Sequence, residues 1–299
     1  MSGLFDRFLR ERQYLSNVTP RTLDWHKQSL AWLRVERPTQ EDLRAFVLRM
    51  REAGLKASSC NCRIRSINAY LRWAASPLRV PKLKEEERLP PTYTAKQVSL
   101  IVRWKPRTFG QRRLHLLLLL LFDTGMRLEE ALSLRVADCD LDNLLLTVTG
   151  KGRKQRIVPM SRELRRALAL AVLDRSSVKQ PEEFVLATKA GRRLGQRNTL
   201  RDVKQLCRAL GFEPPRRTVH ATRHTFAIEY LRRGGSVFHL QKMLGHTTLE
   251  MTRRYANLAT QDLQAIHERV SLLNGGSSAS PGRNGLRLPE RHNSQKPGR

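Results

Sequence analysis

The chain has 299 residues, which is enough for one large domain or two modest ones, each with its own core. Lysine and arginine total 56 against 27 aspartates and glutamates, so the formal net charge is +29, while 40% hydrophobic residues keep the composition in the globular range. A charge this large opposes compactness unless a polyanion neutralises it. Nucleic acid is the first candidate, and an anionic membrane surface is the weaker alternative.

Targeting and membrane segments are not expected. Charged residues run through the N-terminal MSGLFDRFLRERQY, which lacks the apolar stretch of a signal peptide. The longest apolar run, Leu116 to Phe122, is far shorter than the roughly 20 residues that span a bilayer. The four cysteines form no C-x-x-C pair, so zinc ribbons and thioredoxin-type redox motifs are unsupported. We therefore expect a reduced, cytoplasmic protein.

Residues 1–80 predict an all-α domain of short amphipathic helices. Apolar residues recur at helical spacing after Thr19-Pro20 and again after Thr39, and a further helix carries Ile64, Ile67 and Leu71. From Lys56 to Lys82 the chain has six basic residues and no acidic one. A solvated helix face is the ordinary reading of such a run, but the complete lack of acidic residues favours contact with phosphates. The expected DNA-binding residues are Lys56, Arg63, Arg65 and Arg72.

Residues 81–91 are polar and bracketed by prolines, which predicts a linker. The second domain, 92–274, is expected to be mostly α with a small antiparallel β-sheet. It should begin with a helix near Thr94–Arg103 and a buried helix over Leu114–Phe122. A β-hairpin follows, with strands at Leu144–Val148 and Arg156–Val158, and the rest is mainly helical to about Leu273. Residues 275–299 have a basic composition without an apolar period, which predicts a disordered tail suited to holding DNA non-specifically.

Three short clusters have side chains suited to chemistry. Arg127 follows a glycine break after the apolar helix, and Lys151 lies between two glycines at the expected hairpin tip. His220, Arg223 and His224 come together in the third, where His220 and Arg223 share a helix face. His220 and His224 have the spacing of a zinc pair. However, the residue after His220 is alanine and no third ligand stands out, so anion binding is favoured.

The last cluster is Leu244-Gly245-His246 followed by Tyr255. Gly245 is suited to end a helix, and Thr247 with Glu250 predicts a capping box for the next one. Taken alone, Tyr255 fits an apolar helix stripe as well as a reactive role. Considered with the other clusters, two arginines, a lysine, two histidines and a tyrosine suit phosphodiester transfer onto a phenol oxygen. No carboxylate cluster or cysteine–histidine cage for a catalytic metal is visible, so neither metal nor cofactor is expected.

These motifs resemble those of the tyrosine recombinase (phage integrase) family over nearly the whole chain. The family pattern is T-G-x-R-x-x-E, a hairpin lysine, H-x-x-R-H, L-G-H and a tyrosine nine residues beyond that histidine. Six positions match in order: Arg127, Lys151, His220, Arg223, His246 and Tyr255. The sequence departs from the common pattern at Ala221 and Thr222, which weakens a close match to the chromosome-dimer (Xer-type) recombinases.

The resemblance implies a helical DNA-clamping domain, a catalytic domain and a concrete mechanism. Tyr255 would attack a DNA phosphate to form a 3′-phosphotyrosine, and Lys151 would protonate the leaving 5′ oxygen. Arg127, Arg223 and His246 would stabilise the pentacoordinate phosphate, and His220 would assist proton movement at Tyr255. The implied partner is double-stranded DNA with specific sites, bound by four protomers around two duplexes near the bacterial nucleoid. A directionality factor or partner recombinase, and docking of residues 261–273 onto a neighbouring protomer or the same domain, are also implied.

The expected function is therefore site-specific DNA recombination for a mobile genetic element, by integration or excision. Xer-type resolution of chromosome or plasmid dimers is an alternative within the same chemistry. A type IB topoisomerase would use a similar residue set, but a small helical clamp argues against it. A DNA-binding regulator with a decayed site is the alternative from another class, although all six positions are filled here.

Overall fold

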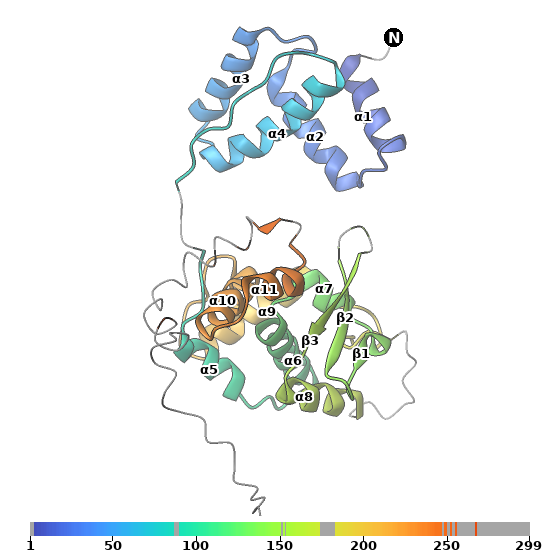
Figure 1. Cartoon of the computed structure of the whole chain (residues 1–299), viewed down its shortest axis with the longest axis vertical. Helices are drawn as coiled ribbons and strands as arrows, with labels where there is room; N and C mark the ends of the chain where they lie inside the picture. The colour runs from blue at the N-terminus through green and yellow to red at the C-terminus, as the bar shows by residue number, and fades with distance from the viewer. Residues whose placement is uncertain are drawn as a thin grey trace, which may run out of the picture. The chain divides into compact units, whose positions relative to one another are not determined.

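The computed structural model describes residues 3–86, 90–150, 152, 154–173, 183–246, 248–249, 252, 255 and 267. The chain divides into two compact units, Met1–Leu89 and Pro90–Arg299 (Figure 1). Within the described residues no helix has the length and apolar character needed to cross a membrane. The calls on Lys151, on Thr247 with Glu250, on a helix over 261–273 and on the tail at 275–299 lie outside the described residues; in the 261–273 stretch only residue 267 is described.

The first unit is built from four helices, as the apolar spacing predicts: α1 (Leu4–Tyr14), α2 (Pro20–Leu33), α3 (Gln40–Glu52) and α4 (Ala57–Trp73). Two threonines determine where helices begin. The hydroxyl of Thr19 accepts the backbone N–H of Thr22, with Pro20 in the first helical turn, and Thr39 forms a capping box with Asp42. The apolar faces of all four helices meet in one core, which includes Phe8, Leu33, Phe46, Ile64, Ile67 and Tyr70.

The segment after α4 is tied to that helix by two asparagines. Asn68 exchanges two hydrogen bonds with the backbone of Val80, each of 2.9 Å. Asn61 does the same with the backbone of Leu83, at 2.9 and 2.8 Å. The first residues of the expected linker at 81–91 therefore lie along α4 as part of the first unit.

The second unit contains the expected small sheet. Strands β1 (Cys139–Asp140), β2 (Leu145–Thr149) and β3 (Gln155–Pro159) pair antiparallel in that order. Leu146 lies opposite Val158 and Thr149 opposite Gln155, which confirms the predicted hairpin. Strand β1 has two residues and was not predicted from the sequence.

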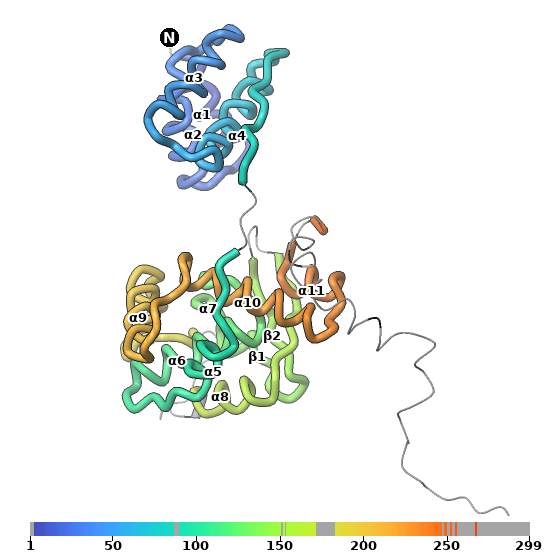
Figure 2. Tube along the Cα trace, turned by 90° about the vertical axis from the view of Figure 1, so that its left-hand side faces the viewer, coloured from blue at the N-terminus to red at the C-terminus, as the bar shows by residue number. Residues whose placement is uncertain are grey.

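Helices pack beside this sheet and share a leucine-rich core with it. They are α5 (Ala95–Arg103), α6 (Phe109–Thr124), α7 (Leu128–Ser133), α8 (Arg162–Leu173), α9 (Gln196–Ala209), α10 (Thr218–Arg232) and α11 (Val237–Leu244), with a 3-10 turn at Val136–Asp138. α6 is packed by α8, α9 and α10, and α9 and α11 lie on opposite sides of the unit (Figure 2). The expected class, mainly α with a small antiparallel sheet, is confirmed.

One stretch without helix interrupts the region that we expected to be mainly helical to about Leu273. Residues 183–195 contain two isolated β-bridges, Arg135 with Phe184 and Ala187 with Arg193. The backbone of Val136 donates to the carbonyl of Glu183 and that of Val185 to Leu134, each at 2.9 Å. At residues 183–185, pairing with residues 134–136 replaces helix, which local spacing could not indicate, whereas the second bridge is a local turn within the stretch.

Candidate active site

The first site arginine is positioned by the end of helix α6. Gly125 ends α6 in the left-handed region at φ +63°, where a side chain would be strained and its Cβ would overlap Phe226 and Leu244. Two residues later, Arg127 forms the N-cap of α7. Its side chain is 40% exposed, so the guanidinium can meet an external phosphate.

Arg223, by contrast, lies on α10 and is only 6% exposed. Its Nη1 donates to the carbonyl of Gly125 at 2.9 Å and its Nη2 to the carbonyl of Leu244 at 2.7 Å. Burial and then the charge of Arg127 lower the pKa of Arg223 to about 10, so it stays charged at neutral pH. The side chain thus joins the ends of α6 and α11 at one point, using two of its five N–H groups.

Glu130 connects Arg127 to the sheet. Its carboxylate accepts the backbone N–H of Arg127 at 2.7 Å and the Nη1 of Arg127 at 2.9 Å. Arg156 of β3 donates to both oxygens of the same carboxylate, at 3.0 and 2.8 Å, and its Nε donates to the carbonyl of Met243 at 2.7 Å. Burial would raise the pKa of Glu130, but the hydrogen bonds from Arg156 and Arg127 outweigh it and lower the pKa. Arg156 therefore ties the hairpin to α7 and α11.

His246 follows the end of α11. Gly245 ends that helix at φ +65°, as expected from the sequence. The Nδ1 of His246 lies 2.9 Å from the hydroxyl of Thr252, which is fully buried. Burial and then the charges of Arg223, Arg127 and Arg156 lower the pKa of His246 to about 4. His246 is therefore neutral at physiological pH.

Tyr255 lies between two histidines. Its ring is stacked on that of His246, with centroids 6.3 Å apart and an interplanar angle of 14°. Its hydroxyl lies 2.8 Å from the Nδ1 of His224. Tyr255 is 7% exposed, and a negative charge on its oxygen would raise the pKa of Arg223. By reciprocity, Arg223 favours the ionised phenol.

Of the remaining candidate residues, His220 has no hydrogen bond to the site within the described part of the chain, and Lys151 lies outside that part. His220 lies on α10 and is exposed; partial burial and then Arg217, Arg223 and Arg127 lower its pKa. Of the hairpin around Lys151, the structure shows the flanking bond from the Gly150 N–H to the Lys154 carbonyl, 2.8 Å long. The zinc-like pair of His220 and His224 is divided, because His224 contacts Tyr255. Across the described part of the chain, no group of three or more His, Cys, Asp or Glu side chains is arranged to hold a metal.

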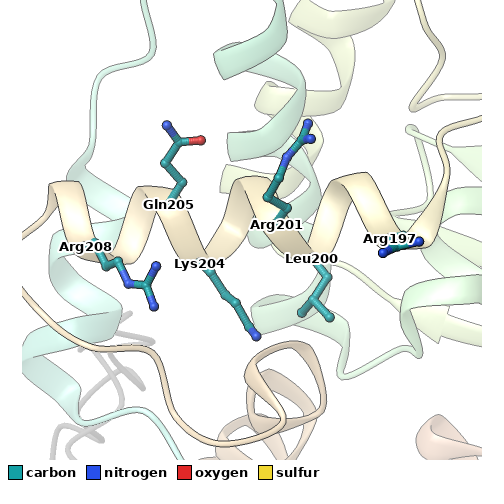
Figure 3. Close-up of a pocket in the computed structure, with 6 residues that line it drawn as sticks. All are labelled: Arg197, Leu200, Arg201, Lys204, Gln205 and Arg208. Atoms are coloured by element: carbon teal, nitrogen blue, oxygen red, sulfur yellow. The ribbon is translucent and has the colours of Figure 1, made fainter.

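Two basic surfaces lie outside this site. In the first unit Lys56, Arg65 and Arg72 are exposed on or beside α4, while Arg63 is half-buried with its guanidinium 5.8 Å from the ring centre of Trp32. In the second unit, α9 carries four exposed basic side chains (Figure 3), which we call the α9 basic row: Arg197, Arg201, Lys204 and Arg208. They recur at positions i, i+4, i+7 and i+11, which is one helix face.

Sequence reasoning missed three features: the α9 basic row, the contact of His224 with Tyr255, and the bridging role of Arg156. The helical spacing of basic residues at 197–208 is a readable signal for the first. The H-x-x-R-H motif contains His224, but its partner lies 31 residues away. For Arg156 we find no local signal beyond an arginine in a strand.

Known proteins resemble this chain over most of its length. The model of the phage integrase family matches residues 92–262. The tyrosine recombinase XerC of Xanthomonas campestris pv. campestris is 31% identical over 281 residues, covering 87% of this chain and 86% of that protein. XerA of Pyrococcus furiosus is 30% identical over 243 residues, covering 79% of this chain and 82% of the relative.

Solved structures share the fold. The integrase of transposon Tn1549, in complex with transposon right-end DNA, has a TM-score of 0.71 at 20% identity, covering 90% of this chain and 100% of that one. XerH recombinase bound to a palindromic difH substrate has a TM-score of 0.68 at 17% identity, covering 88% and 83%. The family match over more than half of the chain is decisive, and the protein belongs to the phage integrase family of tyrosine recombinases, enzymes that cleave and rejoin DNA through a tyrosine.

Proposed function

We propose that this protein is a site-specific DNA recombinase that integrates or excises a mobile genetic element. The observation that carries the chemistry is the convergence of Tyr255, Arg223 and His246 at the junction of α6, α10 and α11, with Arg127 held beside them through Glu130. Arginines grip non-bridging phosphate oxygens and offset the charge that develops in the transition state. A site of this kind needs a phosphodiester as its substrate.

The proposed reaction transfers a DNA phosphate to the phenol. The Tyr255 oxygen attacks phosphorus, the bond to the 5′ oxygen breaks, and a 3′-phosphotyrosine forms. Lys151 protonates the departing oxygen, and Arg127, Arg223 and His246 stabilise the pentacoordinate phosphate. A 5′ hydroxyl from a second strand then reverses the step. Because the phosphotyrosine link conserves the energy of the broken phosphodiester bond, no ATP is consumed.

DNA binding is proposed for both units. Lys56, Arg65 and Arg72 present positive charge on the first unit, and the α9 basic row does so on the second (Figure 3). Basic side chains on one helix face suit the regular spacing of backbone phosphates. We further propose four protomers on two duplexes, with a directionality factor or a partner recombinase setting the outcome.

The mobile-element role is favoured over dimer resolution by the departures at Ala221 and Thr222 and by residues 249–258, which resemble mobile-element integrases. Curated relatives of this chain carry Xer names, so dimer resolution is the competing outcome of the test.

The test is a covalent trap on nicked duplexes. Wild type and Tyr255→Phe are mixed with candidate element ends and, separately, with chromosome-dimer sites, without metal or ATP. We expect denaturant-resistant adducts from wild type alone, and on element ends. Adducts confined to dimer sites would overturn the mobile-element role. Tight binding without any adduct would overturn the recombinase assignment in favour of a DNA-binding regulator.

A further inference from the structure

The hydroxyl of Tyr255 is in contact with a histidine that the family pattern does not assign to the reaction. Two imidazoles flank Tyr255, but they meet it differently. His246 stacks on the ring and uses its Nδ1 for the hydroxyl of Thr252. His224 instead places its Nδ1 2.8 Å from the phenolic oxygen, the atom that must attack. Of these two histidines, His224 is the one whose ring nitrogen contacts the reacting oxygen.

Helix α10 explains how His224 reaches this position. His224 directly follows Arg223, whose guanidinium is held by the carbonyls of Gly125 and Leu244. His224 is half-buried, whereas His220, one turn earlier, is exposed. The ring centroids of His224 and Tyr255 lie 5.7 Å apart and the rings are tilted by 44°, so the two rings are not stacked and meet through the imidazole nitrogen and the hydroxyl. The anchored Arg223 thus fixes the part of α10 that positions the imidazole nitrogen.

We propose that His224 is a catalytic residue that accepts the proton of Tyr255 when the phenol attacks DNA. The inference rests on the proposed function, and it assigns to His224 the step that the family pattern leaves to His220. As the Tyr255 oxygen bonds to phosphorus, its proton passes to Nδ1 of His224. The bond from phosphorus to the 5′ oxygen breaks, and that oxygen takes a proton from Lys151. In the resealing step, a 5′ hydroxyl gives its proton back to Lys151 as its oxygen bonds to phosphorus, and His224 returns its proton to the Tyr255 oxygen as the phosphotyrosine bond breaks.

The chemistry at this point requires such an acceptor. A phenol has an unperturbed pKa near 10, so at neutral pH it must lose a proton to attack well. Arg223 stabilises the phenolate charge, but a guanidinium has no lone pair to receive a proton. Tyr255 is only 7% exposed, which limits transfer to bulk water. A neutral imidazole with its proton on Nε2 presents Nδ1 as the acceptor, at a distance suited to direct transfer.

The first experiment measures single-turnover cleavage of a nicked duplex by wild type, His224→Ala and His224→Asn. Asparagine places an acceptor oxygen close to the position of Nδ1 but is not a base. General bases contribute about 100-fold or more, so we expect both variants to lose at least that factor. Unfolding curves matching wild type show that the loss is not one of folding. If His224→Asn cleaves within about threefold of wild type, a hydrogen bond alone suffices and the proposal is overturned.

A second experiment changes the acidity of the nucleophile itself. A difluorotyrosine at position 255 has a more acidic phenol and depends less on a base. We expect it to restore much of the cleavage lost in His224→Ala and little of that lost in Arg127→Ala, which serves as the matched control. A His224→Ala defect that fluorination does not relieve would reduce His224 to a positioning residue and overturn the proposal.

A substrate with sulfur in place of the bridging 5′ oxygen separates the two proton transfers. A thiolate leaves without protonation, so this substrate bypasses the need for Lys151 and should leave the His224→Ala defect in place. Full recovery of His224→Ala on it would place His224 at the leaving group instead. As the control, wild type must form the covalent adduct and Tyr255→Phe must not. If wild type forms no adduct, the proposed function is wrong. If wild type forms the adduct and His224→Ala cleaves normally, only the role of His224 is refuted.

Discussion

The arginines of the active site and those along helices α4 and α9 carry the same charge but are held in opposite ways. Arg223 is 6% exposed and donates to two carbonyls from different helices, and Arg156 binds a buried carboxylate and a third carbonyl. On α9, Arg201 and Arg208 extend into solvent beside exposed acidic neighbours. We therefore expect function to depend on the fixed geometry of the guanidinium N–H groups in the active site, and on positive charge alone along α4 and α9.

Replacing Arg223 by lysine should give the largest loss of cleavage. One ammonium group cannot donate to the Gly125 and Leu244 carbonyls and also donate a pair of hydrogen bonds to phosphate oxygens. We expect covalent cleavage to fall by about 100- to 1000-fold. The matched control is Arg201→Lys on α9, which keeps the charge and should cleave within about twofold of wild type. Equal tolerance of lysine at both positions would erase the distinction between the two regions.

Removing Arg156 tests the structural half of the comparison. Arg156→Met leaves the carboxylate of Glu130 with Arg127 alone and the Met243 carbonyl without its donor. We expect a loss of about 3 kcal/mol in the free energy of unfolding, measured with urea. Arg166→Met, which breaks an exposed pair with Glu163, should change it by less than about 0.5 kcal/mol. A loss at Arg156 no larger than at Arg166 would show that the Glu130 network is not structural.

Acidification should weaken both units through one histidine in each, the buried His26 and the half-buried His246. Burial and then a nearby arginine lower the pKa of His26 in the first unit to about 4, as burial and arginines do for His246 in the second. Between their ordinary pKa of 6.5 and 4, the unfolded chain binds protons that the folded chain does not. The free energy of unfolding therefore falls as pH drops through this window, by roughly 2 kcal/mol for His26 between pH 7 and pH 5. Urea unfolding at both pH values should show a shallower pH dependence for His26→Gln; an unchanged dependence would contradict the shift.

The surface arginines give the smallest effect, and it appears in salt dependence. Arg201→Ala with Lys204→Ala removes two charges from the α9 basic row, and Arg65→Ala with Arg72→Ala removes two from α4. Each pair should flatten the slope of log affinity against log salt by up to about two, and leave cleavage of saturated DNA near wild type. The slope is read from binding titrations at several salt concentrations. A pair that leaves it unchanged does not touch DNA.

Local signals predicted most of the fold. Thr19, Thr39 and Thr94 mark helix starts that the structure shows as capped, and the hairpin follows from apolar runs on either side of a turn flanked by glycines. The bridge of Arg135 with Phe184 joins residues far apart in the chain, so no short window of sequence contains its cause. Strand β1 pairs with the nearby Leu145 and Leu146, but at two residues it is too short to show an alternating pattern. The α9 basic row has a helical period in the sequence, but the acidic Asp202 lies within it. The stretch from Lys56 to Lys82 has no acidic residue and was therefore easier to notice.

The candidate site was predicted by residue type and order, and its contacts were not. The order of Arg127, Arg223, His246 and Tyr255 marks the family, and the family match confirms that identification. Which histidine meets the Tyr255 hydroxyl depends on where α10 lies relative to Tyr255. That placement sets a distance of 2.8 Å across 31 residues, a quantity that spacing in the sequence does not encode.

The most direct test of the central claim is to identify the residue joined to DNA in a trapped adduct. The adduct is digested with protease and nuclease, and the linked peptide is sequenced by mass spectrometry. We expect a single modified residue, Tyr255, joined through its phenolic oxygen to a 3′ phosphate. A link to any other residue, or to a 5′ phosphate, would contradict it.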